Sequence, residues 1–181
     1  LDTGLSVTGD FMCEVALPNR EIRLIYNKEI LQKCSHIIPA AASISIQEAL
    51  YTGNVSSLKT ELHKLLRESV SYYDTAGENF YHGLVLGLCA AMSDRYYVTS
   101  NRESGYGRYD IQLMPRENDF PGILIELKAM KHCDHLKILA EEALQQIKEQ
   151  SYAAEMQAKG ITNICKYGVA FSGKYVEICM E

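Results

Sequence analysis

The apolar run Gly122-Ile123-Leu124-Ile125-Glu126-Leu127 limits the fold of this 181-residue chain more than any other feature. Successive residues of a strand point to opposite faces, so a run that is apolar on both faces predicts a central, covered strand. Its one exception, Glu126, is a carboxylate that is costly to bury unless a cation or hydrogen bonds compensate it. Glu126 is therefore the residue that most needs a functional explanation.

Two further charged residues could share a site with Glu126. Lys128 lies two positions further along the same predicted strand, so both side chains point to one face. Asp110 ends the segment Gly105-Tyr106-Gly107-Arg108-Tyr109-Asp110, sixteen positions before Glu126. Two carboxylates and an ammonium group suit a divalent metal held beside a phosphate. The same alternation of polar and apolar residues is also typical of an ordinary half-exposed strand, so spacing alone leaves both interpretations open.

The predicted secondary structure is of the α/β class, with a mixed sheet flanked by helices. A helix that crosses from the strand at 122–129 to the strand at 164–171 would make those two strands parallel. After residue 74 the patterns predict a helix at 75–92, strands at 96–100, 109–114 and 122–129, one long helix at 135–159 that ends at Gly160, and strands at 164–171 and 175–180.

The N-terminal part is predicted to be a mostly helical extension. We expect a strand at 10–17, a helix from Asn19 to about Ser35 and a short helix at 43–52. An amphipathic helix follows, marked by Leu58, Leu62, Leu65, Leu66 and Val70. We place the domain boundary between residues 55 and 56, so that 1–55 form a junction and 56–181 the main domain. The chain begins at Leu1 instead of Met, and we expect it to be a fragment of a longer protein.

The net charge of −5 argues against a broad electrostatic grip on nucleic acid, although it leaves room for a local basic rim. Basic residues gather in two places: Lys59, His63, Lys64 and Arg67, and then Lys128, Lys131, His132, His135 and Lys137. We expect the first group to be a solvated helix face.

No apolar run approaches the roughly 20 residues that cross a bilayer, so no membrane association is expected. The six cysteines form no C-x-x-C pair, which is typical of reduced thiols and predicts a cytoplasmic protein without structural zinc.

The order of these elements, with the residues that they carry, resembles the PD-(D/E)XK nuclease superfamily and its restriction-endonuclease-like αβββαβ core. The resemblance covers about residues 70–181. It is carried by Glu78, the Gly-x-Gly-Arg-x-Asp segment ending at Asp110, Glu126-x-Lys128, Gln146-Ile147 with Tyr152, and the segment 168–174. Two positions depart from the family's pattern, since Tyr109 replaces the proline and Asn101 stands where an acidic residue is expected.

The match is closest to a bacterial branch of the superfamily that is fused behind AAA-type ATPase-like domains. The segment Leu17-Pro18-Asn19-Arg20-Glu21-Ile22 resembles the junction that follows the ATPase in that branch. The resemblance therefore implies an ATPase-like domain in the same parent chain.

The resemblance also implies a Mg²⁺-dependent nuclease that hydrolyses the phosphodiester bonds of DNA with water. It assigns Asp110 and Glu126 as ligands of Mg²⁺, with Mn²⁺ as a substitute, and adds the backbone carbonyl of Leu127 as a further ligand. Glu78 would be a third acid near the metal, directly or through water. Lys128 would lie near the attacking water and the scissile phosphate.

The resemblance places Gln146 among the catalytic residues, in contact with a phosphate or a metal-bound water, and Arg108, Tyr152 and His82 among the substrate-binding ones. Each has a simpler alternative. Gln146 could be a surface amide, Tyr152 a core residue, Arg108 the partner of Glu103, His82 a residue bonded to a neighbour, and Glu78 a solvent-exposed helix residue.

A second hypothesis is a catalytically inactive module of the same fold that binds nucleic acid or a protein partner. The acidic net charge slightly favours this hypothesis, whereas the intact set of Asp110, Glu126 and Lys128 favours the enzyme. A homodimer is expected if both strands of a duplex are cut.

Overall fold

The computed structural model describes residues 3–5, 11–13, 40–70, 78–117, 119–132 and 134–181. The chain divides into two units, Leu1–His36 and Ile37–Glu181. In the first unit, strands β1 (Thr3–Leu5) and β2 (Phe11–Cys13) pair antiparallel. Strand β2 lies within the strand predicted at 10–17, whereas the helix predicted from Asn19 to Ser35 lies outside the described residues. The boundary between residues 55 and 56 stays a prediction.

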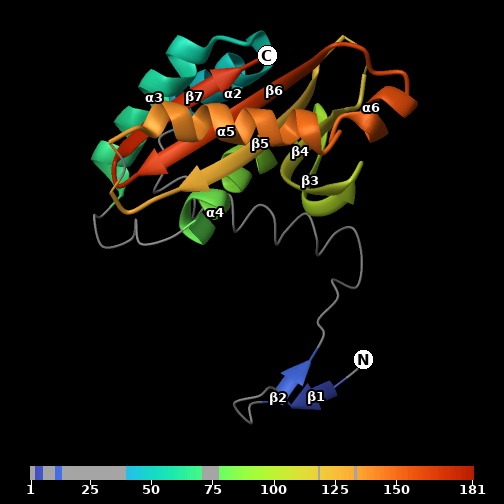
Figure 1. Ribbon diagram of the computed structural model, residues 1–181, viewed down its shortest axis with the longest axis horizontal. Helices are drawn as coiled ribbons and strands as arrows, with labels where there is room; N and C mark the ends of the chain where they lie inside the picture. The colour runs from blue at the N-terminus through green and yellow to red at the C-terminus, as the bar shows by residue number, and fades with distance from the viewer. Residues whose placement is uncertain (1–2, 6–10, 14–39, 71–77, 118, 133) are drawn as a thin grey trace. The chain divides into compact units, whose positions relative to one another are not determined.

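The second unit has the predicted α/β architecture, built on a mixed sheet with the strand order β3-β4-β5-β6-β7 (Figure 1). Strands β5 and β6 are parallel, as the crossover predicts, and the other neighbouring strands are antiparallel. Its elements are α2 (Ala40–Thr52), α3 (Val55–Ser69), α4 (Glu78–Ala90), β3 (Tyr96–Ser104), β4 (Gly107–Pro115), β5 (Gly122–Ala129), α5 (Leu136–Glu149), α6 (Ala154–Ala158), β6 (Ile164–Ser172) and β7 (Tyr175–Met180).

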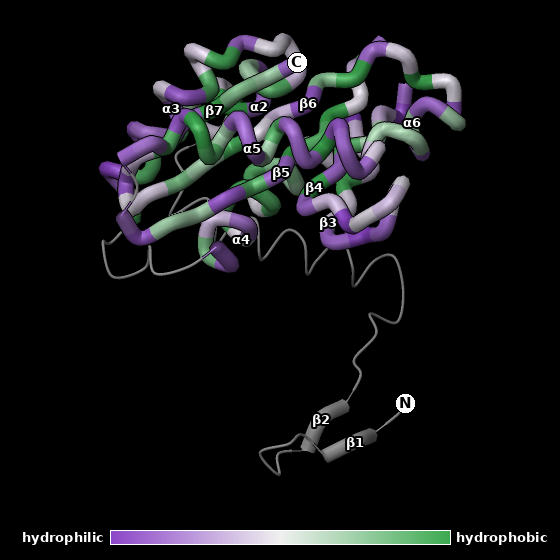
Figure 2. Tube along the Cα trace, in the orientation of Figure 1, coloured by the Kyte–Doolittle hydropathy of each residue, from purple (hydrophilic) through white to green (hydrophobic). Residues whose placement is uncertain are grey.

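Helices cover both faces of this sheet. Helix α5 packs on β5, β6 and β7, and helices α2, α3 and α4 pack on the opposite face (Figure 1). The larger core lies on the α2–α3–α4 side, where Ile123, Ile125 and Leu127 of β5 contribute alternate residues. Smaller clusters lie under α5 and α6, and one of them includes Leu124. Figure 2 shows the hydrophobic stretches in the sheet and the hydrophilic residues along α3 and α5. Side chains alternate between the two faces along β5, and Ile123, Ile125 and Leu127 point into the larger core. Glu126 and Lys128 therefore point to the other face, which α5 covers.

Helix α3 confirms the amphipathic pattern expected between Leu58 and Val70. The Asn54 side chain caps its start by accepting a hydrogen bond from the Ser57 backbone N–H at 3.0 Å. Its leucines at three- and four-residue spacing are buried against the sheet. This helix later supplies one wall of a pocket.

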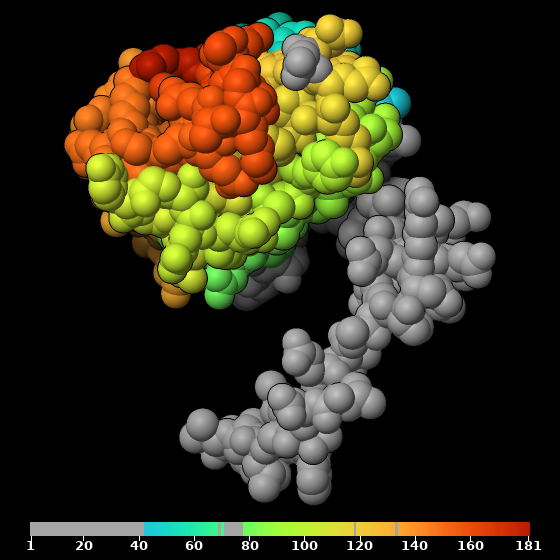
Figure 3. Space-filling model, turned by 90° about the vertical axis from the view of Figure 1, so that its right-hand side faces the viewer, coloured from blue at the N-terminus to red at the C-terminus, as the bar shows by residue number. Residues whose placement is uncertain are grey.

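The prediction of a single helix over 135–159 is wrong, because the helix is interrupted after α5 and a second helix, α6, follows. Ser151 adopts a positive φ of 53°, and the Gln150 carbonyl accepts a hydrogen bond from the Tyr106 N–H at 2.9 Å. Tyr152 then enters the core. Figure 3 shows this segment, in orange, beside the β3–β4 hairpin in yellow-green. The break is thus stabilised by contacts with residues distant in sequence.

Within the described residues, no helix combines the length and the apolar character needed to span a bilayer. The cysteines whose side chains are described there, Cys89, Cys165 and Cys179, are free thiols.

Candidate active site

Asp110 lies where strands β4 and β5 stop pairing regularly. Their ladder pairs Ile111 with Ile125, and the same register continued by one residue would bring Asp110 opposite Glu126. At this point the Leu127 backbone N–H donates a hydrogen bond to Asp110 Oδ2 at 2.8 Å. The Asp110 side chain thus takes the place of a ladder carbonyl, which fixes its carboxylate beside β5.

Glu126 is almost fully buried, with 3% of its surface exposed. Its pairing partner in the parallel strand β6 is Gly168, and a Cβ at Gly168 would overlap the backbone of Ala140 and Leu144 in α5. The missing side chain therefore lets α5 approach the sheet closely next to Glu126. Sequence reasoning did not find this role of Gly168, although a glycine inside an apolar strand is a signal of close backbone approach.

The buried Glu126 carboxylate lacks sufficient compensation. Its Oε2 atom has no hydrogen-bond partner among the described residues. Burial, and then the negative charge of Asp110, raise the pKa of Glu126 to about 7, while Lys128 and a backbone hydrogen bond from Asp110 act in the opposite direction. A further positive charge at this point would stabilise the ionised form.

Lys128 is held between Glu126 and helix α5. Its Nζ lies 3.4 Å from Glu126 Oε1 and donates a hydrogen bond to Gln146 Oε1 at 2.6 Å. Gln146 Nε2 in turn donates to the Tyr152 hydroxyl at 3.3 Å. Gln146 is thus a half-buried member of a hydrogen-bond chain and differs from the surface amide considered as its alternative.

Tyr152 occupies the core position that was considered as its alternative role. It is 2% exposed, and its ring packs edge-on against Tyr109 with 6.3 Å between ring centroids. Any effect of Tyr152 on a substrate would therefore pass through Gln146. Its assignment to substrate binding stays a prediction.

His82 approaches the site from the opposite side of the sheet. Its Nε2 lies 3.3 Å from the Asp110 carbonyl oxygen and 3.3 Å from Asn101 Nδ2. Asn101 adopts a positive φ of 53°, at the point where the β3–β4 pairing is interrupted. His82 is therefore bonded to neighbours and contacts the backbone, not the carboxylate, of Asp110.

Glu78 and Arg108 are both exposed, in contrast to the buried Glu126. Glu78 is exposed at the first residue of α4. In the described part of the chain, no group of three or more His, Cys, Asp or Glu residues is placed to hold a metal, so Glu78 does not join Asp110 and Glu126. Arg108 is exposed opposite Glu103 in the β3–β4 hairpin. The roles predicted for both residues stay predictions.

The site combines two carboxylates with one ammonium group, and this set could hold a divalent cation together with several waters. The unpaired Glu126 Oε2 and the raised pKa of Glu126 are the features that such a cation would compensate. The Leu127 carbonyl stays a predicted ligand. The ammonium of Lys128 remains close enough to Glu126 to act on an anion bound beside the carboxylates.

A comparison with protein families identifies the part of the chain that carries this site. A model described as the PD-(D/E)XK nuclease superfamily matches residues 76–181, which is more than half of the chain. The matched segment runs through the whole five-stranded sheet and both helices on the α5 side. No curated protein matches the chain significantly.

Proposed function

Because the chain belongs to the PD-(D/E)XK nuclease superfamily, we propose that it is a metal-dependent nuclease that hydrolyses phosphodiester bonds in DNA. The observation that carries the proposal is the buried Glu126 carboxylate with its unpaired Oε2 atom. Evolution of a purely structural sheet would favour an apolar residue here, because an uncompensated buried carboxylate destabilises the fold. Its position beside Asp110 and Lys128 supports a role in chemistry.

Asp110 and Glu126 would hold Mg²⁺, or Mn²⁺ in its place, with the Leu127 carbonyl as a further ligand and Glu78 acting through water. When bound, the metal would lower the pKa of a water molecule and offset negative charge on the phosphate. The Lys128 ammonium would stabilise the charge that develops on the phosphate or orient the attacking water. Gln146 would keep Lys128 in position through its 2.6 Å hydrogen bond. Arg108 and His82 would contact the substrate.

We also propose that this nuclease is the C-terminal part of a larger cytoplasmic bacterial protein with an ATPase-like domain. The resemblance of residues 17–22 to the junction of that branch supports this arrangement. The complete gene tests it directly, because it must encode the ATPase-like domain upstream. Sedimentation of the chain tests the expected homodimer.

The decisive experiment compares wild type with Glu126→Ala in cleavage of supercoiled plasmid and of labelled single strands. We expect wild type to cleave with Mg²⁺ or Mn²⁺ and not with EDTA. The variant should lose about 10³-fold in rate, since a metal supplies several kcal/mol to such reactions. Glu117→Ala, at an exposed position, is the matched control and should cleave like wild type.

Two outcomes would contradict the proposal. Cleavage that Glu126→Ala leaves unchanged would remove Glu126 from the mechanism. A folded wild type that binds the metal and cleaves nothing would favour the inactive module that binds nucleic acid or a protein partner.

A further inference from the structure

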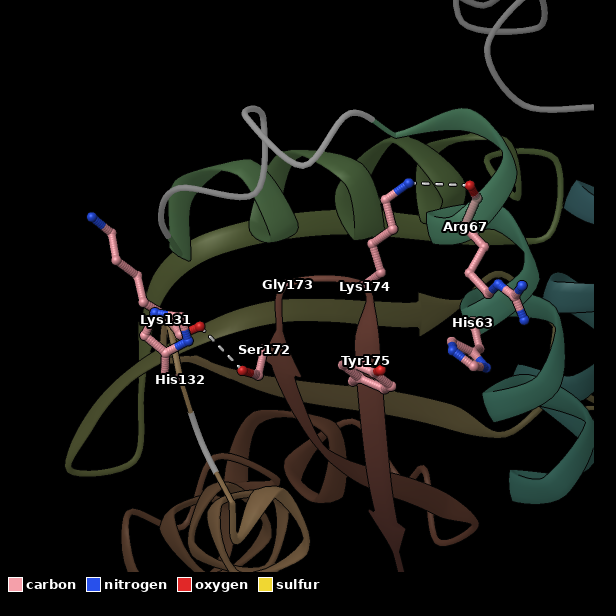
Figure 4. Close-up of a pocket in the computed structure, with 8 residues that line it drawn as sticks. All are labelled: His63, Arg67, Lys131, His132, Ser172, Gly173, Lys174 and Tyr175. Carbon is pink, nitrogen blue, oxygen red and sulfur yellow. Dashed lines mark hydrogen bonds between the residues drawn. The ribbon is translucent and has the colours of Figure 1, made fainter.

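A second polar site, here called the basic pocket, lies beyond the end of β5 that carries Lys128. It encloses about 560 Å³ between three segments of the chain (Figure 4). Helix α3 contributes His63 and Arg67, the segment after β5 contributes Lys131 and His132, and the β6–β7 turn contributes 172–175. Lys131 and His132 lie on one side of that turn, and His63 and Arg67 on the other (Figure 4).

Among the described residues that line the basic pocket are three cations, Arg67, Lys131 and Lys174, together with two histidines and no carboxylate, on a chain whose net charge is −5. The ion pairs found between described residues include none of Arg67, Lys131 and Lys174. Lys174 Nζ instead donates a hydrogen bond to the Arg67 carbonyl oxygen at 3.2 Å. Three cationic side chains around one cavity, with no carboxylate among the described residues that line it, favour an anionic ligand with several acceptor oxygens, such as a phosphate.

An aromatic ring stands at the edge of these cations. Tyr175 is 68% exposed and stacks on His63, with 5.9 Å between the ring centroids and 28° between the planes. One face of the Tyr175 ring is therefore covered, and the exposed remainder can take a base. A positive groove beside an exposed aromatic ring is the combination that binds single-stranded nucleic acid.

The site of Asp110, Glu126 and Lys128 is here called the carboxylate site. The basic pocket is close to it along the chain. Lys131 follows Lys128 by three residues, which span at most about 11 Å. Helix α4 contacts both sites. At the basic pocket the Tyr81 hydroxyl donates a hydrogen bond to the Gly173 carbonyl at 2.7 Å, and at the carboxylate site the next residue, His82, contacts the Asp110 carbonyl. One strand of nucleic acid could therefore reach both sites.

We propose that the basic pocket binds a phosphate in a single-stranded segment of the substrate, close to the hydrolysed bond, with a base stacked on Tyr175. This inference rests on the proposed nuclease function. It adds that the substrate is single-stranded, or unpaired, next to the site of cleavage.

The first test measures binding of a labelled single-stranded oligonucleotide in EDTA, so that no cleavage is required. We expect Lys131→Gln/Lys174→Gln to lower affinity about tenfold and to reduce the slope of log K against log salt by about 0.7 for each phosphate that the protein no longer neutralises. Lys159→Gln/Lys166→Gln is the control, since it removes the same charge before and at the start of β6. Equal affinity of the two folded double variants would overturn the proposal.

The second test uses Tyr175→Ala, because its exposed ring can be removed with little effect on folding. Loss of a stacked base should lower single-strand affinity about tenfold and leave duplex affinity unchanged. Equal losses on both substrates would overturn the single-strand assignment. Tight binding of an acidic protein at the basic pocket, without binding of nucleic acid, would also overturn the proposal.

The outcomes of these binding tests and of the cleavage test distinguish failure of the basic-pocket proposal from failure of the nuclease proposal. Binding through the basic pocket without Glu126-dependent cleavage would overturn the nuclease and support the pocket. Glu126-dependent cleavage with binding insensitive to Lys131, Lys174 and Tyr175 would overturn the pocket and leave the nuclease standing.

Discussion

The carboxylate site and the basic pocket differ in the sign and in the burial of their charged side chains. Asp110, Glu126 and Lys128 carry both signs of charge, are largely buried and are fixed by hydrogen bonds to the sheet and to α5. The basic pocket carries one sign, opens to solvent and is built from a turn and a helix face. A buried charge needs a fixed partner, whereas water screens an exposed one until a ligand arrives. The first site is therefore suited to a cation held in fixed geometry, and the second to a mobile phosphate chain.

The largest expected difference between the two sites concerns stability in the absence of metal. The pKa of Glu126 is raised from 4.5 to about 7 in the folded protein. Because the folded state keeps its proton to higher pH than the unfolded state, wild-type stability falls as pH rises through this window. Glu126→Gln lacks this effect, so above about pH 7 it should be more stable than wild type by about 3 kcal/mol.

Urea unfolding in EDTA at about pH 4 and about pH 8 measures this difference. Lys131→Gln in the basic pocket serves as the control and should shift stability by less than about 0.5 kcal/mol at both pH values. A stability gain for Glu126→Gln that is the same at both pH values would show that Glu126 does not titrate as its burial requires.

Metal affinity is the next way to separate the two sites. Asp110→Asn keeps an oxygen that can accept the Leu127 N–H hydrogen bond but removes a charged ligand. We expect it to weaken Mn²⁺ binding by about 100-fold or more in calorimetry, since even indirect changes around metals cost about 10- to 100-fold. Asp94→Asn at an exposed position, and the basic-pocket variants, should bind Mn²⁺ like wild type. Equal affinities for Asp110→Asn and Asp94→Asn would remove Asp110 from the ligand set.

The same lysine substitution should have different effects in the two sites. Lys128→Met leaves the buried Glu126 without its cation and should raise the pKa of Glu126 further. We expect it to cost about 1–2 kcal/mol near pH 8, less than a fully buried pair because the Lys128 side chain is 31% exposed. Lys174→Met should stay within about 0.5 kcal/mol, as exposed substitutions usually do. Similar costs in parallel urea titrations would contradict the contrast drawn between the two sites.

Much of the fold could be predicted because its signals are local. The run from Gly122 to Ala129 predicts β5 with the bounds that the structure has, since an apolar strand between a turn and a basic loop has few alternatives. The break after α5 could not be predicted, because residues 135–159 favour one helix locally. It depends on the Tyr106–Gln150 hydrogen bond and on the burial of Tyr152, which only the tertiary structure provides.

The candidate sites also have some features that local sequence signals predict and others that depend on tertiary packing. Alternation along the strand and family resemblance are enough to nominate Asp110, Glu126 and Lys128 from the sequence. The closeness of α5 at Gly168, which buries Glu126, depends on packing between elements and left only a weak signal. The basic pocket was missed as a unit because its three segments lie far apart in the chain, so the α3 group was interpreted as a solvated helix face.

The smallest expected effect belongs to Gln146, which tests whether the hydrogen-bond chain from Tyr152 to Lys128 matters. Gln146→Leu removes the acceptor at 2.6 Å from Lys128 Nζ and the donor to Tyr152. We expect a loss of about 1 kcal/mol in stability and about a tenfold lower cleavage rate, because Lys128 loses the group that orients it. Gln145→Leu is the matched control, since this neighbouring glutamine is exposed and its side chain donates a hydrogen bond to Glu149 along the helix. If both variants cleave alike, Lys128 needs no support from α5, and the fixed geometry that distinguishes the carboxylate site from the basic pocket comes from the sheet alone.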